Sequence, residues 1–246
     1  MIADAKPIIE LIGVMKDHGG HTPLRVQAFS CGASDRIALV GFDAAAAETL
    51  VHLITGAALP EEGTVRTAGR DTREISNDTD WLVSLDQFGL VTDRAVLIDA
   101  LAVEANLALP LTLSIDPMSA TTRSRVSEIA AAVGLEPGRL AAPTSTLSRI
   151  ERIHLHLGRA LVSRPKMLLL EHPTATLASD EEKAALGRSL RKAATAGSCG
   201  WLALTSDEVF IQASGARQFV VDPSTGRLSV PGRFRALLHR LSRRAG

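Results

Sequence analysis

Short apolar runs, set between polar turns and longer amphipathic stretches, divide the chain into alternating predicted strands and helices. Two runs near the N-terminus, at 8–14 and 24–29, flank a polar turn and indicate two antiparallel strands of an edge sheet. The run at 35–40 contains the continuous apolar stretch 37–40, which is typical of a strand covered on both faces. The stretch 44–56 that follows favours a helix that ends at Gly56.

The middle of the chain, from about 91 to 143, has a helical pattern. Apolar residues between 96 and 103 fall on one helical face, and a second helix is predicted over 125–133, closed by Gly134. Just before this block, the short run 81–85 is interpreted as another buried strand. We therefore expect a helical subdomain inserted into a strand-rich core.

The C-terminal half opens with a strong helix-start signal. Ser148 is a good N-cap, and Glu151 three positions later completes a capping box for a helix that runs to Val162. The four apolar residues 167–170 indicate a central strand, and 180–196 forms an amphipathic helix pattern. Further strands are predicted at 201–204 and 219–221, and a basic helix at 231–246.

Strands that alternate with helices predict an α/β fold with a mainly parallel sheet. We expect one domain over 1–246, whose α/β core with an antiparallel β edge comprises about 1–90 and 144–230. The helical subdomain then comprises about 91–143, and the basic helix 231–246 ends the chain.

Composition narrows the possible partners. Lysine plus arginine equals aspartate plus glutamate, 27 each, so net charge attracts the chain neither to nucleic acid nor to a membrane. Aromatic residues make up 3% of the sequence, too few for a nucleic-acid stacking platform. Cys31 and Cys199 are expected to be buried hydrophobes in a reducing cytosol. No signal peptide or membrane helix is predicted, so we expect any membrane attachment to depend on another subunit.

One stretch has the frame of a phosphate-binding loop. The apolar strand at 37–40 runs through Gly41 into a helix, as in the pattern G-x-x-x-x-G-K-[ST]. Counted from Gly41, the second glycine is replaced by Ala46, the lysine by Ala47 and the hydroxyl by Glu48. The frame is present, but the groups that hold phosphate and magnesium are replaced.

The order and spacing of several landmarks resemble those of the ATP-binding subunit of ABC transporters, particularly the lipoprotein-release and macrolide-export type. Residues 41–50 stand where that family has its Walker A loop. Residues 147–151 stand at the Leu-Ser-Gly-Gly-Glu signature, followed by a matching stretch at 158–166. Residues 167–177 match the Walker B strand and the turn after it. The resemblance implies a P-loop NTPase-like core.

The resemblance also implies where catalysis would occur, and the residues there differ from the family pattern. Glu171 replaces the magnesium-binding aspartate, His172 the glutamate that activates water, and Ser206 the histidine that senses the γ-phosphate. We therefore predict no active catalytic residue, no metal site, and weak or absent binding of ATP and Mg²⁺.

The nucleotide-contacting positions are also mostly altered. The resemblance places an adenine-stacking aromatic at His18, and its Q-loop glutamine at Asp86 or, after a shift of one residue, at Gln87. The signature glycines are replaced by Arg149 and Ile150. The full set of implied cofactor-binding positions is His18, Gly41, Ala44, Ala46, Ala47, Glu48, Thr49, Asp86 or Gln87, Ser148, Arg149, Ile150 and Glu151.

Three functional hypotheses follow from this resemblance. The first is a pseudo-ATPase that serves a membrane permease as a structural or regulatory partner, in the cytoplasm at the inner membrane. The second is one half of a heterodimer that still binds ATP and supports hydrolysis by a paralogous subunit, and the third is a soluble scaffold or regulator. A dimer with itself stays open, and the transported substrate would be set by the membrane subunit.

Overall fold

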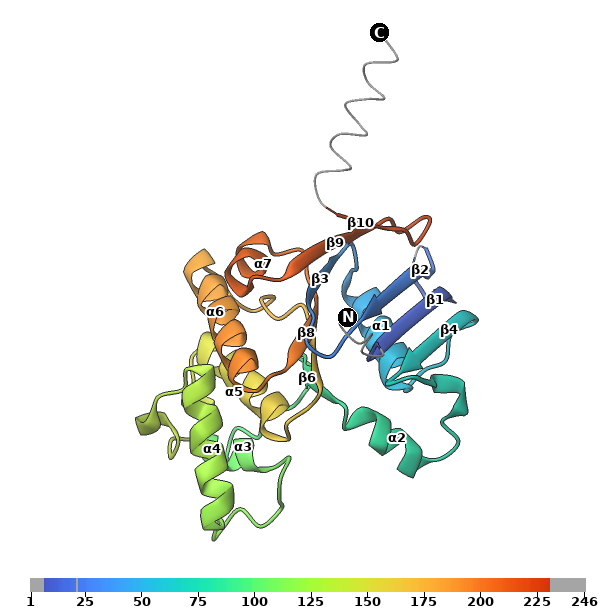
Figure 1. The fold of residues 1–246 in the computed structure, drawn as a ribbon. Coiled ribbons are helices and arrows are strands. Elements are labelled where there is room, and N and C mark those ends of the chain that lie inside the picture. Colours follow the sequence, from blue (N-terminus) through green and yellow to red (C-terminus); the bar gives the residue numbers. More distant parts are fainter. Residues whose placement is uncertain (1–6, 21, 231–246) are drawn as a thin grey trace, which may run out of the picture.

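The computed structural model describes residues 7–20 and 22–230, and the predicted helix at 231–246 lies outside these residues. Two sheets form the framework (Figure 1). The larger sheet has six strands in the order β10-β9-β3-β8-β7-β6, and the smaller one four strands in the order β2-β1-β4-β5. The larger sheet comprises β3 (Arg36–Val40), β6 (Phe88–Val91), β7 (Met167–Glu171), β8 (Gly200–Leu204), β9 (Arg217–Val221) and β10 (Leu228–Ser229). The smaller comprises β1 (Ile9–Lys16), β2 (Leu24–Cys31), β4 (Glu62–Thr67) and β5 (Arg70–Asp71).

The direction of the strands confirms the predicted fold class. All pairs from β9 through β3, β8 and β7 to β6 are parallel, and β10 alone runs antiparallel to its neighbour. The smaller sheet is antiparallel throughout. Parallel strands need helical crossovers, whereas antiparallel strands need only turns. The chain is therefore an α/β core with an antiparallel β edge.

Helix α1 (Ala44–Thr55) lies between the two sheets (Figure 1). Ile37 and Leu39 of β3 join the same buried cluster as α1 and the smaller sheet, whereas Ala38 faces the opposite cluster. This alternation follows from the period of two along a strand. It explains why residues 37–40 are apolar on both faces of the strand.

The opposite face of the larger sheet is covered by five further helices of the described chain, among which Trp201 of β8 is fully buried. Asn106 is the one fully buried amide side chain on this side of the described chain, and it bonds to Thr144 at 2.9 Å. The helices on this face are α3 (Val103–Ala108), α4 (Ala120–Val133), α5 (Arg149–Val162), α6 (Asp180–Ala196) and α7 (Glu208–Ser214).

Helix ends are placed largely as the sequence predicts. Gly56 and Gly134 end α1 and α4 in the left-handed conformation, which glycine adopts without steric cost. Ser148 and Glu151 form both halves of the capping box at the start of α5.

Two predicted elements are wrong. Residues 81–85 belong to helix α2 (Asp78–Leu85), not to a strand, because Asn77 caps the backbone amide of Asp80 and α2 is largely exposed. The apolar residues of 96–102 precede α3 in irregular backbone, since the side chain of Asn106 bonds to both the amide and the carbonyl of Ile98.

Both cysteines are buried, as predicted. Burial raises the pKa of Cys31 to about 12 and that of Cys199 to about 11, so both remain unreactive thiols. Among the residues with described positions, no helix is both long enough and apolar enough to cross a bilayer.

Candidate functional site

The candidate site lies where β3 and β7 end and α1 begins. Gly41 connects β3 to α1 with a φ of 111°, in a region that side chains rarely adopt. A Cβ atom there would lie 2.7 Å from the carbonyl oxygen of Val221, so the neighbouring strand also requires a glycine. The turn therefore requires glycine both for its backbone conformation and for its close contact with β9.

The N-terminus of α1 is capped by a carboxylate from the same loop. Asp43 Oδ1 accepts a hydrogen bond from the backbone amide of Ala46 at 2.8 Å. Helix N-termini attract anions because their amides are unpaired and the helix dipole is positive there. In this chain the nearest anion is the carboxylate of Asp43.

The side chains along the first turns of α1 offer little to a phosphate. Ala47, at the position of the lysine, is fully buried. Ala44 is an exposed methyl group, and the Thr49 hydroxyl donates back to the carbonyl of Ala45 at 2.8 Å. Glu48, where the family resemblance predicts a magnesium-binding hydroxyl, carries a carboxylate that pairs with Arg94.

One guanidinium holds Glu48 and Glu171 together. Arg94 Nη2 lies 2.6 Å from each carboxylate oxygen of Glu171, and Arg94 Nη1 pairs with Glu48. His52, one turn after Glu48 on α1, places its Nε2 3.4 Å from Arg94 Nη1. The positive charge between α1 and the end of β7 is therefore the guanidinium of Arg94, a side chain of this protein.

Glu171 is the more buried of the two carboxylates, with 9% of its side chain exposed against 42% for Glu48. Burial raises the pKa of Glu171 above its ordinary value, and Arg94 opposes that rise. The Thr92 hydroxyl lies 3.4 Å from Glu171 Oε2 and accepts from Arg94 Nε at 3.3 Å. The hydroxyl of Thr92, two residues earlier, therefore helps to orient the Arg94 guanidinium.

His172 and Ser206 stand at the ends of neighbouring strands. The amide of His172 donates to the carbonyl of Leu204 at 2.9 Å, and its φ is 40°. The Nε2 atom of His172 is buried with no partner among the residues described. Ser206 lies two residues past β8 and is exposed.

His18 lines a small cavity with Gly41, Phe42 and Ala46, so the structure brings this position next to the loop. The cavity has a volume of about 120 Å³. Pockets that enclose small ligands typically have roughly 300–1,000 Å³.

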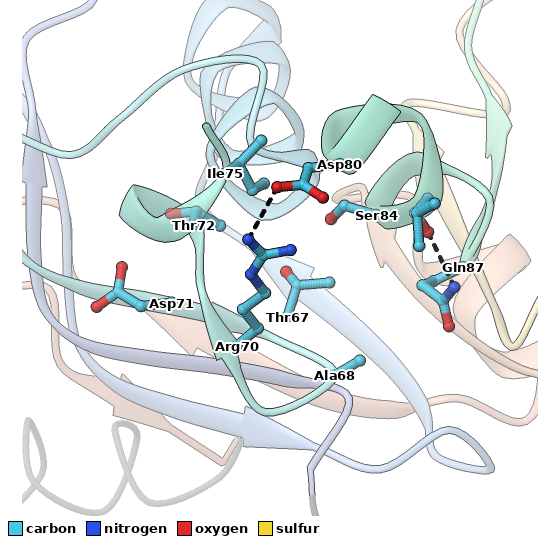
Figure 2. A pocket seen from close by; sticks show the side chains of 10 residues that line it. Thr67, Ala68, Arg70, Asp71, Thr72, Ile75, Asp80, Ser84 and Gln87 are labelled. Atoms are coloured by element: carbon cyan, nitrogen blue, oxygen red, sulfur yellow. Dashed lines mark hydrogen bonds and ion pairs between the residues drawn. The ribbon is translucent and has the colours of Figure 1, made fainter. Parts of the chain in front are cut away.

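The structure does not bring Asp86 and Gln87, the predicted Q-loop positions, to this site. Both precede β6, whereas Glu171 ends the parallel neighbour β7, so they lie at the opposite end of these strands. Gln87 instead lines a separate cavity of about 220 Å³ near Arg70 and Asp80 (Figure 2). The carboxyl end of β6 leads to Thr92 and Arg94, whose side chains contact Glu171 in the candidate site.

The signature positions form a second region. Ser148 caps α5, and Glu151 also bonds to Arg139 Nε at 2.8 Å. Burial opposes ionisation, but the bonds from Ser148 and Arg139 hold the pKa of Glu151 below its ordinary value. Ile150 packs partly buried against the core, and exposed Arg149 lines a cavity of about 530 Å³ with Asp93 and Asp99. No direct bond links these residues to α1 in the described part of the chain.

Sequence reasoning missed Arg94 and Asp43. The signal for Asp43 is local, because an aspartate before an alanine run is a common N-cap. Arg94 gives no local signal, since its two carboxylates are 46 and 77 residues away. Within residues 7–20 and 22–230, no group of three or more histidine, cysteine, aspartate or glutamate side chains is arranged to hold a metal ion.

Comparison with models of known protein families shows to which family the chain belongs. A family model described as ABC transporter matches residues 24–175, more than half of the chain. The chain belongs to the ABC transporter family. A curated ABC relative is the lipoprotein-releasing system ATP-binding protein LolD of Psychrobacter arcticus, 30% identical over 155 residues, which are 63% of this chain and 68% of LolD.

Other ABC relatives are longer proteins. The Fe(3+) ions import ATP-binding protein FbpC 2 of Rhodococcus jostii is 31% identical over 170 residues, 69% of this chain. The macrolide export ATP-binding/permease protein MacB 1 of Aeromonas hydrophila is 26% identical over 187 residues, 74% of this chain. The chain spans 46% of the length of FbpC 2 and 28% of MacB 1.

Solved structures agree on the ABC fold. CbiO1 from Clostridium perfringens, part of the ABC transporter complex cbiONQ, has a TM-score of 0.75 at 18% identity and covers 91% of this chain and 87% of its own. The dimeric ATP-binding cassette MJ0796 bound to ADP and Pi has a TM-score of 0.70 at 20% identity, with 90% and 98% covered. At these identities the similarity establishes the fold alone.

Proposed function

We propose that the chain is an ABC cassette subunit that keeps the fold but turns over little or no ATP, and that serves a membrane permease as a structural or regulatory partner. The observation that carries this proposal is Arg94, whose guanidinium pairs with both Glu48 and Glu171. The family has magnesium-binding groups at those two positions. A divalent cation in the same partly buried space would be repelled by the guanidinium.

The phosphate side of the site supports the same conclusion. The carboxylate of Asp43 already accepts from the amide of Ala46, and Glu48 adds a second negative charge. Ala47 has no ammonium group to offer. A hydrogen bond to a charged group contributes roughly 1.5–3 kcal/mol, so loss of the lysine alone weakens binding by about tenfold to a hundredfold.

Hydrolysis is affected more strongly than binding. Each placed electrostatic group in such a site typically contributes about a hundredfold to a thousandfold in rate, although the losses do not simply add. The catalytic glutamate is replaced by His172 and the sensor histidine by Ser206. The residues present do not fit a magnesium-dependent phosphoryl transfer.

A titration with labelled ATP, with and without Mg²⁺, tests the loss of nucleotide binding. We expect no saturation below millimolar ATP, whereas submillimolar, magnesium-dependent binding would overturn the proposal. A matched variant that restores the family residues, Ala46→Gly with Ala47→Lys, Glu48→Ser and Arg94→Gln, serves as the comparison. Its binding should exceed that of the natural chain by at least tenfold.

The names of the relatives support the permease partner. LolD is named as part of a lipoprotein-releasing system, and MacB 1 as an ATP-binding/permease protein. We propose that a permease subunit holds this chain at the cytoplasmic side of the inner membrane. Affinity purification from membranes should recover that subunit, and recovery of the chain only as a free monomer would exclude it.

The heterodimer remains the second candidate, because α5 presents an intact capping box with Ser148 and Arg149 exposed at its start. In the family this region contacts the nucleotide of the partner cassette. Mixing the chain with a paralogous ATPase subunit and measuring turnover tests this role. Arg149→Gly with Ile150→Gly should increase turnover if the heterodimer forms, and no change in turnover would exclude it.

A further inference from the structure

Residues 92–99 form the connecting segment that leads from the end of β6 toward α3. Side chains from three other elements hold this segment. Glu48 of α1 and Glu171 of β7 hold Arg94, near the start of the segment. Arg159 Nη1 of α5 donates to the carbonyl of Val96 at 2.6 Å, and Arg152 Nη1 of α5 pairs with Asp99 at 2.9 Å.

The far end of the connecting segment is fixed to α3. Asn106 accepts from the amide of Ile98 at 3.0 Å and donates to its carbonyl at 2.9 Å. Asn106 is fully buried and also bonds to Thr144, so its position is fixed by packing. The segment is therefore bound to the α/β core at one end and to the helical part at the other.

The contact of the connecting segment with α1 and β7 depends on the charge of Arg94. Arg94 makes the only ion pairs between the connecting segment and α1 or β7 among the described residues. Arg94 Nη2 contacts both oxygens of Glu171 and Nη1 contacts Glu48, so one guanidinium joins carboxylates from two elements of the core. Val96 and Asp99 contact α5, which follows the helical subdomain in sequence, and Ile98 contacts α3 within it.

We propose that Arg94 is an internal link, called the fastener below. Its ion pairs fix the start of the helical part to the α/β core, so that the two parts keep one arrangement without any bound ligand. The inference rests on the proposed function, because it requires Arg94 to occupy the space between Glu48 and Glu171. It adds a mechanical role, in which the guanidinium links α1 and β7 to the connecting segment. A permease partner would then meet a surface of constant shape.

Hydrogen–deuterium exchange of the nucleotide-free chain tests the fastener. The variant Arg94→Met with Glu171→Gln removes the pair without leaving a buried charge unpaired. Amides of residues 92–99 should exchange about tenfold faster or more, because the amides of Arg94 and Ala95 bond only to Thr92 within the same turn. Amides of α6 and β8 should be unchanged.

The matched control removes a comparable ion pair elsewhere. Arg66 Nη1 and Glu10 Oε2 lie 3.1 Å apart on the smaller sheet, and Arg66→Met with Glu10→Gln should leave exchange in 92–99 unaffected. Equal exchange in both double variants and the natural chain would overturn the fastener. Because no nucleotide is present, this result is independent of the ATP titration: tight ATP binding would reject the proposed function, and unchanged exchange would reject the fastener alone.

Discussion

Glu48 and Glu171 come from α1 and β7, yet both carboxylates pair with the single guanidinium of Arg94. The arrangement satisfies two negative charges with one positive charge in a partly buried site. Charges in such a site are stabilised only while their partners remain.

The first prediction concerns the free energy of unfolding of Arg94→Met. Loss of the guanidinium leaves Glu171 buried without a partner, so we expect a loss on the order of 2 kcal/mol, between the values for exposed and fully buried pairs. Arg94→Met with Glu171→Gln should recover at least half of that loss in urea unfolding. Equal stabilities of the single and double variants would show that the pair is not coupled.

The second prediction concerns pH. Burial lowers the pKa of His154 to about 4, with Glu151 opposing, whereas the unfolded chain titrates at about 6.5. The unfolded state therefore binds the proton more tightly, so stability is fully present above pH 6.5 and is lost as pH falls through 4. The contribution is on the order of 3 kcal/mol at most.

His154→Leu should reduce this acid dependence, measured as urea unfolding at several pH values between 4 and 7. The Nε2 atom of His154 has no partner among the described residues, so the variant should not be destabilised at pH 7. His156, whose pKa burial also lowers to about 4, should account for part of the dependence that remains. An unchanged acid transition in His154→Leu would contradict the assignment.

The third prediction concerns the contact between β6 and α5. A Cβ atom on Gly89 would collide with the carbonyl oxygen of Ala160 and lie 2.7 Å from Leu168 Cδ2. Gly89→Ala should therefore cost about 1–3 kcal/mol through overpacking. Gly138→Ala is the control, because a Cβ atom there has no heavy atom within 4 Å and should change stability by about 0.5 kcal/mol or less. Similar thermal midpoints for the two variants would contradict the prediction.

The fourth prediction compares two buried threonines that line the cavity in Figure 2. Thr67 Oγ1 donates to the carbonyl of Ile54 at 2.5 Å, whereas Thr72 Oγ1 has no partner among the described residues. Thr67→Val should cost about 1 kcal/mol, and Thr72→Val should be neutral or stabilising, since it removes an unpaired buried hydroxyl. Urea unfolding checks both, and a larger loss for Thr72→Val would reveal a bond that the structure does not contain.

Much of the fold follows from local sequence signals. Gly134 after an amphipathic stretch and Ser148 three residues before Glu151 are caps that act within one turn of helix. The alternation of Ile37, Ala38 and Leu39 likewise reflects only the period of a strand between two packed layers. These features were predictable because their causes lie within a few residues.

The sequence predictions fail where contacts between residues far apart in the sequence determine the structure. Residues 81–85 have a strand-like apolar run, but the N-cap Asn77 and acidic residues in the first turn favour helix α2. Alignment on Phe88 selects Asp86 and Gln87, but it does not reveal that these residues lie at the opposite end of the strands from Glu171. Arg94 was missed because neither of its carboxylates is near it in sequence.

The carboxylate of Asp43 at the start of α1 has a consequence for the folded population of the protein. A protein that binds a ligand only when folded gains stability as the ligand concentration rises above its dissociation constant. In this chain the amide of Ala46 and the carboxylates of Glu48 and Glu171 are already paired internally. Under the proposed function, its folded fraction would therefore depend little on the nucleotide concentration of the cell, and the proposed subunit would be equally available for assembly in starved and in growing cells.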